Sequence, residues 1–140
     1  MVDNLGHVIH IDYGFILGIS PGGNLGFETA AFKINADMIT LMGGFHSDTY
    51  ADFVDLVVKG YLVARSVSEP IMDIVQCLAD SGLPCFMHKD DNLDRMRARF
   101  MLDVTTSEAA KHMRGKAADA ADKWTTNAYD GLQKMQNNIH

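Results

Sequence analysis

Apolar residues recur every three or four positions through much of the chain after residue 34. Between Tyr50 and Leu62 they are spaced as on one face of a helix, and Ser47 or Asp48 can cap its start. Asn35 can cap a shorter helix that runs through residue 42 and ends at two consecutive glycines. The pattern therefore predicts two successive helices, the second of which buries an apolar stripe.

The same reasoning predicts further helices down to the C-terminus. One predicted helix has a proline in its first turn and ends at a Ser-Gly pair, and another starts at Thr-Ser-Glu and is rich in alanine. The predicted helices cover residues 69–81, a basic stretch at about 91–100, a stretch from 106 toward 124, and about 128–138. We therefore expect a mainly α fold with about six helices over residues 35–140.

The first 34 residues have a different pattern. Apolar residues alternate around an Asn-Leu-Gly turn in residues 2–11, which predicts a short β-hairpin. Residues 12–33 contain too many glycines for a helix or a long strand. A loop of that length in a compact domain is usually functional.

Composition narrows the class of protein. Hydrophobic residues make up 47% of the 140, enough for one packed core. The net charge of −6 argues against a general nucleic-acid binder, because phosphate contacts need a basic surface. The two cysteines have no metal-type spacing, and no stretch has the length of a membrane span. We expect a cytoplasmic protein that is soluble or peripheral at membranes.

The sequence His10-Ile11-Asp12-Tyr13-Gly14 is the clearest candidate for chemistry. It places a carboxylate at the end of an apolar strand, where it can hold Mg²⁺ against nucleotide phosphates. Asp-Phe-Gly has that role in protein kinases. Five residues alone are more typical of an ordinary turn, so the motif needs support from the rest of the chain.

That support comes from an ordered set of motifs. Together they resemble the phosphatidylinositol 3-/4-kinase family, and most closely its type III alpha 4-kinases, at the C-terminal part of the catalytic domain. The resemblance implies the C-lobe of a protein-kinase-like fold, in which a short β-hairpin precedes the helices. The matching stretches are residues 6–15, 20–28, 37–38, 42–44, 60–62, 82–86, 99–100, 108–110, 129–130, 136–137 and 139.

The resemblance implies roles for individual residues. Asp12 is similar to the family's catalytic, metal-binding acid, and with Ile11 it would contact ATP and Mg²⁺. Residues 12–34 resemble the activation loop, which meets the inositol headgroup. Its implied substrate-contacting residues are Gly14, Phe15, Ser20, Pro21, Gly22, Gly23, Asn24 and Lys33. Because no lysine or arginine lies between Phe15 and Phe32, plain phosphatidylinositol is the implied substrate.

Some features depart from the family pattern. Tyr13 replaces the usual phenylalanine, Gly18 an acid and Thr29 a proline. The family's catalytic loop and nucleotide-binding lobe belong before Met1, so these 140 residues alone are expected to be inactive. The implied parent enzyme transfers the ATP γ-phosphate to the 4-hydroxyl of phosphatidylinositol in a membrane. Two alternatives stay open: a fragment of a phosphatidylinositol-kinase-like protein kinase, or a non-catalytic helical interaction module.

Overall fold

The structure is a computed structural model that describes residues 3–7, 9–11, 16–17, 19, 32, 34, 36–87 and 89–122. Helices account for most of these ranges, and no strand is assigned within them. The elements are α1 (Ala36–Leu41), α2 (Asp48–Ser66), α3 (Ser68–Cys77), the short 3-10 helix η1 (Pro84–Phe86), α4 (Lys89–Arg99) and α5 (Thr106–Asp122). The mainly α fold expected from the sequence is confirmed.

The connection from α1 to α2 follows directly from local sequence. Gly43 and Gly44 have φ angles of 86° and 91°, which end α1 because few other residues adopt the left-handed region. The Gly44 N–H donates to the Ile39 carbonyl at 2.9 Å. Ser47 then caps α2, since its hydroxyl oxygen accepts from the Tyr50 N–H at 3.1 Å.

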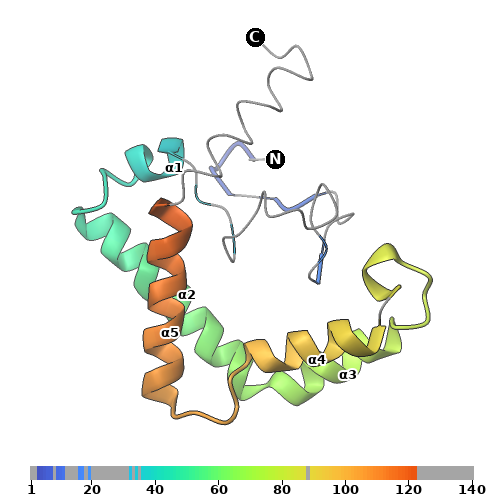
Figure 1. Ribbon diagram of the computed structural model, residues 1–140. Coiled ribbons are helices and arrows are strands. Elements are labelled where there is room, and N and C mark those ends of the chain that lie inside the picture. Colours follow the sequence, from blue (N-terminus) through green and yellow to red (C-terminus); the bar gives the residue numbers. More distant parts are fainter. Residues whose placement is uncertain are drawn as a thin grey trace.

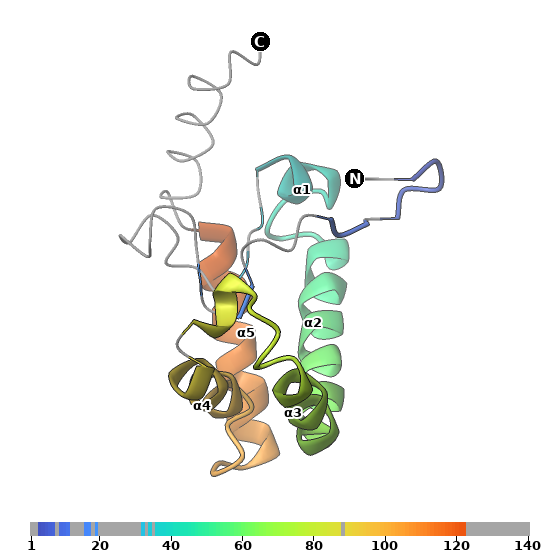
Figure 2. The same ribbon diagram turned by 90° about the vertical axis from the view of Figure 1, so that its right-hand side faces the viewer.

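Helices α2 and α5 lie side by side and together form what we call the first arm (Figures 1 and 2). Alanines on α5 make close packing possible: Ala109, Ala117 and Ala120 are completely buried. The Arg114 guanidinium on α5 and the Asp55 carboxylate on α2 form an ion pair at 2.8 Å near the surface. Small side chains thus set the spacing of the two helices.

Helices α3 and α4 also lie side by side and, with η1, form the second arm (Figures 1 and 2). Met72 on α3 is 2% exposed and is one of the most buried side chains in this arm. The Arg97 and Glu69 side chains join α4 to α3 by an exposed ion pair at 2.5 Å.

The two arms meet at a corner made of Val67 and residues 100–105, and they diverge from it (Figure 1). Helix α2 ends there: the Val67 backbone leaves the helical region, with φ −119° and ψ 30°, and its N–H bonds to the Ala64 carbonyl at 3.2 Å. Side chains of α2 reach across the corner to the connection between α4 and α5. The hydroxyl of Tyr61 and the guanidinium of Arg65 contact backbone carbonyls of that connection.

Most sequence-based element boundaries agree with these helices. The hairpin prediction is not confirmed: residues 3–7 form a turn with an Asp3 N–H to His7 carbonyl bond of 3.0 Å, but no strand is assigned to residues 9–11. The helix predicted at about 128–138 lies outside the described residues. None of the helices in the described ranges is both long and apolar enough to cross a membrane.

Candidate functional site

The sequence predicts a site at the glycine-rich loop, and Ile11 is the one proposed site residue that the structure describes. Its side chain is 56% exposed, so it is available to a partner or ligand rather than part of the core. The other predicted residues lie outside the described residues: Asp12, Gly14, Phe15, Ser20, Pro21, Gly22, Gly23, Asn24 and Lys33. The geometry of the site therefore comes from the segments that enter and leave the loop.

The entering segment is anchored at the tip of the second arm. Ile16, Leu17 and Ile19 pack against a buried cluster of Ala79, Cys85 and Phe86, together with Val75 and Leu93. The Ile19 N–H bonds to the Ile16 carbonyl at 3.3 Å. Leu17 has a φ of 57°, an unusual value for a residue with a side chain, so the chain turns sharply where it meets this cluster. We call this contact the first anchor.

The leaving segment is anchored at the tip of the first arm. Ile34 is buried in a cluster with Ile39 of α1 and Ala120 of α5, and Phe32 packs on its edge. Met42, Tyr50 and Phe53 complete the surroundings of this cluster. Phe53 and Tyr50 stack with ring centroids 6.4 Å apart. We call this contact the second anchor.

The two anchors hold opposite ends of the loop on different arms. Residues 20–31 lie between them in sequence, and this stretch contains most of the predicted substrate contacts. Sequence reasoning did not identify the anchors. The available signal was the apolar character of residues 16, 17, 19, 32 and 34 on either side of the glycines.

Asn92 of α4 is hydrogen-bonded to the backbone of the first anchor. Its side chain is 4% exposed, its amide N–H donates to the Cys85 carbonyl, and its amide oxygen accepts from Arg95. The Arg95 guanidinium also pairs with the Asp91 carboxylate at 3.1 Å. A polar network thus fixes η1, which carries two of the buried residues in the cluster, against α4.

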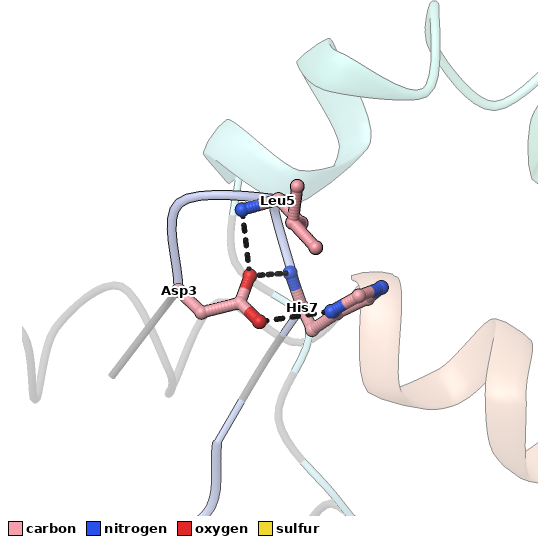
Figure 3. A network of polar contacts seen from close by, with 3 residues as sticks. All are labelled: Asp3, Leu5 and His7. Atoms are coloured by element: carbon pink, nitrogen blue, oxygen red, sulfur yellow. Dashed lines mark hydrogen bonds and ion pairs between the residues drawn. The ribbon is translucent and has the colours of Figure 1, made fainter.

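The turn before the predicted metal-binding segment is held by Asp3 (Figure 3). Its carboxylate accepts from the backbone N–H groups of Leu5 at 2.9 Å and His7 at 2.8 Å, and from the His7 ring at 2.9 Å. The His7 backbone N–H, followed by the His7 ring, lowers the pKa of the Asp3 carboxyl below its ordinary value. Asp3 therefore remains ionised in this turn at neutral pH.

Other chemistry is limited within the described ranges. No group of three or more His, Cys, Asp or Glu side chains there is placed to hold a metal ion. A shallow, open hollow on α5 lies among six mainly charged residues and contains none of the predicted site residues: Glu108, Lys111, His112, Gly115, Lys116 and Asp119. The anchored loop is therefore the candidate site.

Comparison with known proteins gives the family. The model for phosphatidylinositol 3- and 4-kinases matches residues 1–88, which include the turn, the loop and helices α1 to α3.

Curated relatives extend the similarity along nearly the whole chain. Phosphatidylinositol 4-kinase alpha 2 of Arabidopsis thaliana is 43% identical over 142 residues, which cover 99% of this chain and 27% of the relative. Phosphatidylinositol 4-kinase STT4 of Saccharomyces cerevisiae is 40% identical over 141 residues, with 99% and 7% covered. Phosphatidylinositol 4-kinase beta of Danio rerio is 36% identical over 140 residues, with 99% and 16% covered. The chain thus spans 27% or less of the length of these relatives. The family match and these identities show that the chain belongs to the phosphatidylinositol 3- and 4-kinase family.

Proposed function

We propose that residues 1–140 form the C-terminal part of a phosphatidylinositol 4-kinase catalytic domain. The enzyme transfers the γ-phosphate of ATP to the 4-hydroxyl of phosphatidylinositol. The observation that carries this proposal is the similarity to phosphatidylinositol 4-kinases over 99% of the chain, which includes the candidate site. In this assignment the enzyme works at the cytoplasmic surface of a membrane, where its substrate is held.

Asp12 is the proposed metal ligand and Ile11 lines the nucleotide site beside it. Mg²⁺ is bound in such sites by one or two carboxylates together with phosphate oxygens, so a single aspartate at this position fits the requirement. The metal, when bound, neutralises charge that develops on the transferred phosphoryl group. The proposed role of Asp12 is to hold the metal ion through a carboxylate oxygen. Asp12 follows Ile11 directly in the sequence.

Residues 14–33 are the proposed substrate loop. Two apolar anchors on different arms support this role. They hold Ile16, Leu17 and Ile19 near the start of the loop and Phe32 and Ile34 at its end. The loop has no lysine or arginine between Phe15 and Phe32. Cations in such a loop would pair with phosphates on the inositol ring, so their lack favours an unphosphorylated ring.

The remaining catalytic parts come from elsewhere in the kinase. Phosphoryl transfer needs a group that orients the attacking hydroxyl and a lysine on the ATP phosphates. In this proposal the N-lobe and catalytic loop supply them, and residues 1–140 alone do not turn over substrate. The 140-residue chain therefore needs those parts as partners.

The test uses a full-length kinase that carries residues 1–140 at the place of the matched stretch in the relatives. Asp12→Asn keeps the size of the side chain but removes the charge that Mg²⁺ needs. We expect turnover of phosphatidylinositol to fall about 100-fold or more, whereas the matched change Asp52→Asn on the exposed face of α2 leaves it unchanged. Turnover within about threefold of the parent, a barrier change under about 0.7 kcal/mol, removes Asp12 from the catalytic residues.

The lipid panel in the same assay tests substrate choice. The kinase is given phosphatidylinositol, its 4-phosphate and its 4,5-bisphosphate in vesicles of otherwise equal composition. We expect phosphatidylinositol to be used far better than the other two. Equal rates on a phosphorylated inositide contradict the assignment, and transfer of phosphate to protein alone points to a protein kinase.

A further inference from the structure

Arg65 of α2 makes several hydrogen bonds at the corner between the arms. The Arg65 guanidinium donates to the carbonyls of Phe100 at 3.0 Å, Met101 at 3.1 Å and Val104 at 2.6 Å. It also reaches the Thr106 hydroxyl at 3.5 Å. One cation on α2 thus binds Phe100, Met101 and Val104 in the connection between α4 and α5, and the first residue of α5.

Tyr61, one helical turn earlier on α2, contacts the same connection. Its hydroxyl lies 3.0 Å from the Arg99 carbonyl and 3.2 Å from the Phe100 carbonyl. Burial raises the pKa of the Tyr61 hydroxyl above its ordinary value, so the group remains a donor at neutral pH. We call Tyr61 and Arg65 the corner clamp.

The connection that the clamp holds contains a residue with an unfavourable backbone conformation. Met101 has a φ of 51°, in the left-handed region that non-glycine residues rarely adopt. Its carbonyl is one of those that Arg65 binds. Strained backbone of this kind persists where surrounding contacts determine it, and here the contacts come from α2.

The clamp lies where the two arms meet, and each arm carries one anchor of the substrate loop at its other end (Figure 1). Packed helices move as rigid bodies, so the angle at the corner sets the distance between the anchors. Residues 20–31 connect the two anchors in the sequence, so that distance is the span that the chain has to bridge between them.

We propose that Arg65, assisted by Tyr61, is a positioning residue for the lipid substrate: it fixes the angle between the arms and thereby the span of the substrate loop. The proposal rests on the function assigned above. It concerns the lipid side of the reaction, because the stretch between the two anchors contains the proposed substrate contacts Ser20, Pro21, Gly22, Gly23 and Asn24. Ile11 and Asp12, which are proposed for the nucleotide side, come before the first anchor in the sequence.

Kinetics of the full-length kinase test the proposal. In Arg65→Met we expect kcat/KM for phosphatidylinositol to fall about tenfold or more while KM for ATP stays within about twofold of the parent. Arg65→Lys restores little, because a single ammonium cannot bind several carbonyls at fixed angles as a planar guanidinium does. Arg114→Met is the control, since Arg114 also joins α2 to α5 by an ion pair but lies away from the corner.

A distance measurement tests the same idea without activity. Spin labels are placed on native Cys77, which is exposed whereas Cys85 is buried, and on Thr49→Cys at the exposed start of α2. These positions report the separation of the two arms in the 140-residue chain. We expect Arg65→Met to shift or broaden the distance distribution and Arg114→Met to leave it unchanged.

The outcomes separate the two proposals. If the parent kinase uses phosphatidylinositol and Arg65→Met behaves as Arg114→Met in both measurements, the positioning role is overturned and the function stands. A fall in kcat with equal changes in both KM values, or an unchanged distance distribution, also overturns it, because a role in stability alone explains that result. A parent kinase without activity on phosphatidylinositol overturns the function, and the role of Arg65 in lipid positioning falls with it.

Discussion

Asn92 is a buried polar side chain in α4, and both ends of its amide have partners. The N–H group donates to the Cys85 carbonyl, and the oxygen accepts from the Arg95 guanidinium. Burial of an amide is tolerated when these bonds form and is costly when one partner is lost. This one side chain therefore ties α4 to η1 beneath the first anchor.

Removal of that amide should destabilise the second arm. We expect Asn92→Ala to lower the free energy of unfolding by about 1–3 kcal/mol, because the Cys85 carbonyl loses its side-chain donor in a buried position. Urea unfolding followed by helical circular dichroism measures the change. Asp94→Ala, at an exposed position of the same helix, is the control and should remain within about 0.5 kcal/mol of the parent. Equal stability of the two variants contradicts the role given to Asn92.

Residues such as Asn92, Tyr61 and Arg65 mark the limit of sequence reasoning at this scale. Apolar positions such as Val54 and Val58 were predicted because their spacing repeats along one helix, and both are buried. The polar contacts of Arg65 join it to residues 35 or more positions away in the sequence. Local spacing does not specify partners at such a distance. The predicted catalytic residue Asp12 remains a prediction, since it lies outside the described residues.

At the scale of elements, α5 begins with a reciprocal cap. The Thr105 hydroxyl accepts from the Glu108 N–H at 3.3 Å, and the Glu108 carboxylate accepts from the Thr105 N–H at 2.9 Å and its hydroxyl at 2.7 Å. The side-chain bond from Thr105, followed by its backbone N–H, lowers the pKa of the Glu108 carboxyl below its ordinary value.

The lowered pKa of Glu108 predicts a pH dependence of unfolding. A carboxyl group whose pKa is lower in the folded state stabilises that state above the unfolded pKa, here about 4.5, and loses the effect as pH falls through the folded value. We expect urea midpoints to drop between about pH 5 and pH 3, and to drop less in Glu108→Gln. When Thr105→Ala is already present, adding Glu108→Gln should change this drop less, because the hydroxyl that bonds to the Glu108 carboxylate is gone. An identical pH profile for the parent and Glu108→Gln contradicts the cap.

Element boundaries were largely predictable because their determinants are local. Gly43, Gly44 and Ser47 specify the connection between α1 and α2 through backbone angles and one cap. The short helix η1 was not predicted, because three residues carry no periodicity. The predicted hairpin remains unconfirmed beyond its turn, since a two-stranded pair depends on partners that local sequence does not show.

At the scale of the whole molecule, large apolar side chains stay in contact with solvent. On α2, Leu56 and Val63 are each 65% exposed, and with Val67 they lie along one face of the helix. The hydrophobic spacing of α2 predicted a helix with one buried stripe, but not that this second apolar face would lie outside the core. The arrangement of helices as two arms decides which face is covered, and it brings together residues far apart in the sequence, such as Arg65 and Phe100.

These exposed side chains predict self-association of the 140-residue chain. Sedimentation velocity between about 1 and 100 µM should show a concentration-dependent increase in size. Leu56→Lys combined with Val63→Lys should reduce it without lowering stability, because neither side chain is in the core. Met87→Lys, exposed on a different surface, is the control. A single monomeric boundary for the parent at every concentration contradicts the prediction.

The corner also gives the molecule a mechanical property: α2 acts as a lever arm, and the corner is the fulcrum about which it turns. Helix α2 has 19 residues and is therefore about 28 Å long. A rotation of about 5° at the fulcrum moves the tip of α2 by about 2.4 Å, several times the tolerance of about 0.5 Å within which reacting groups have to be held. A small rotation at the corner is thus amplified along the helix into a larger displacement of the second anchor, which packs near its other end.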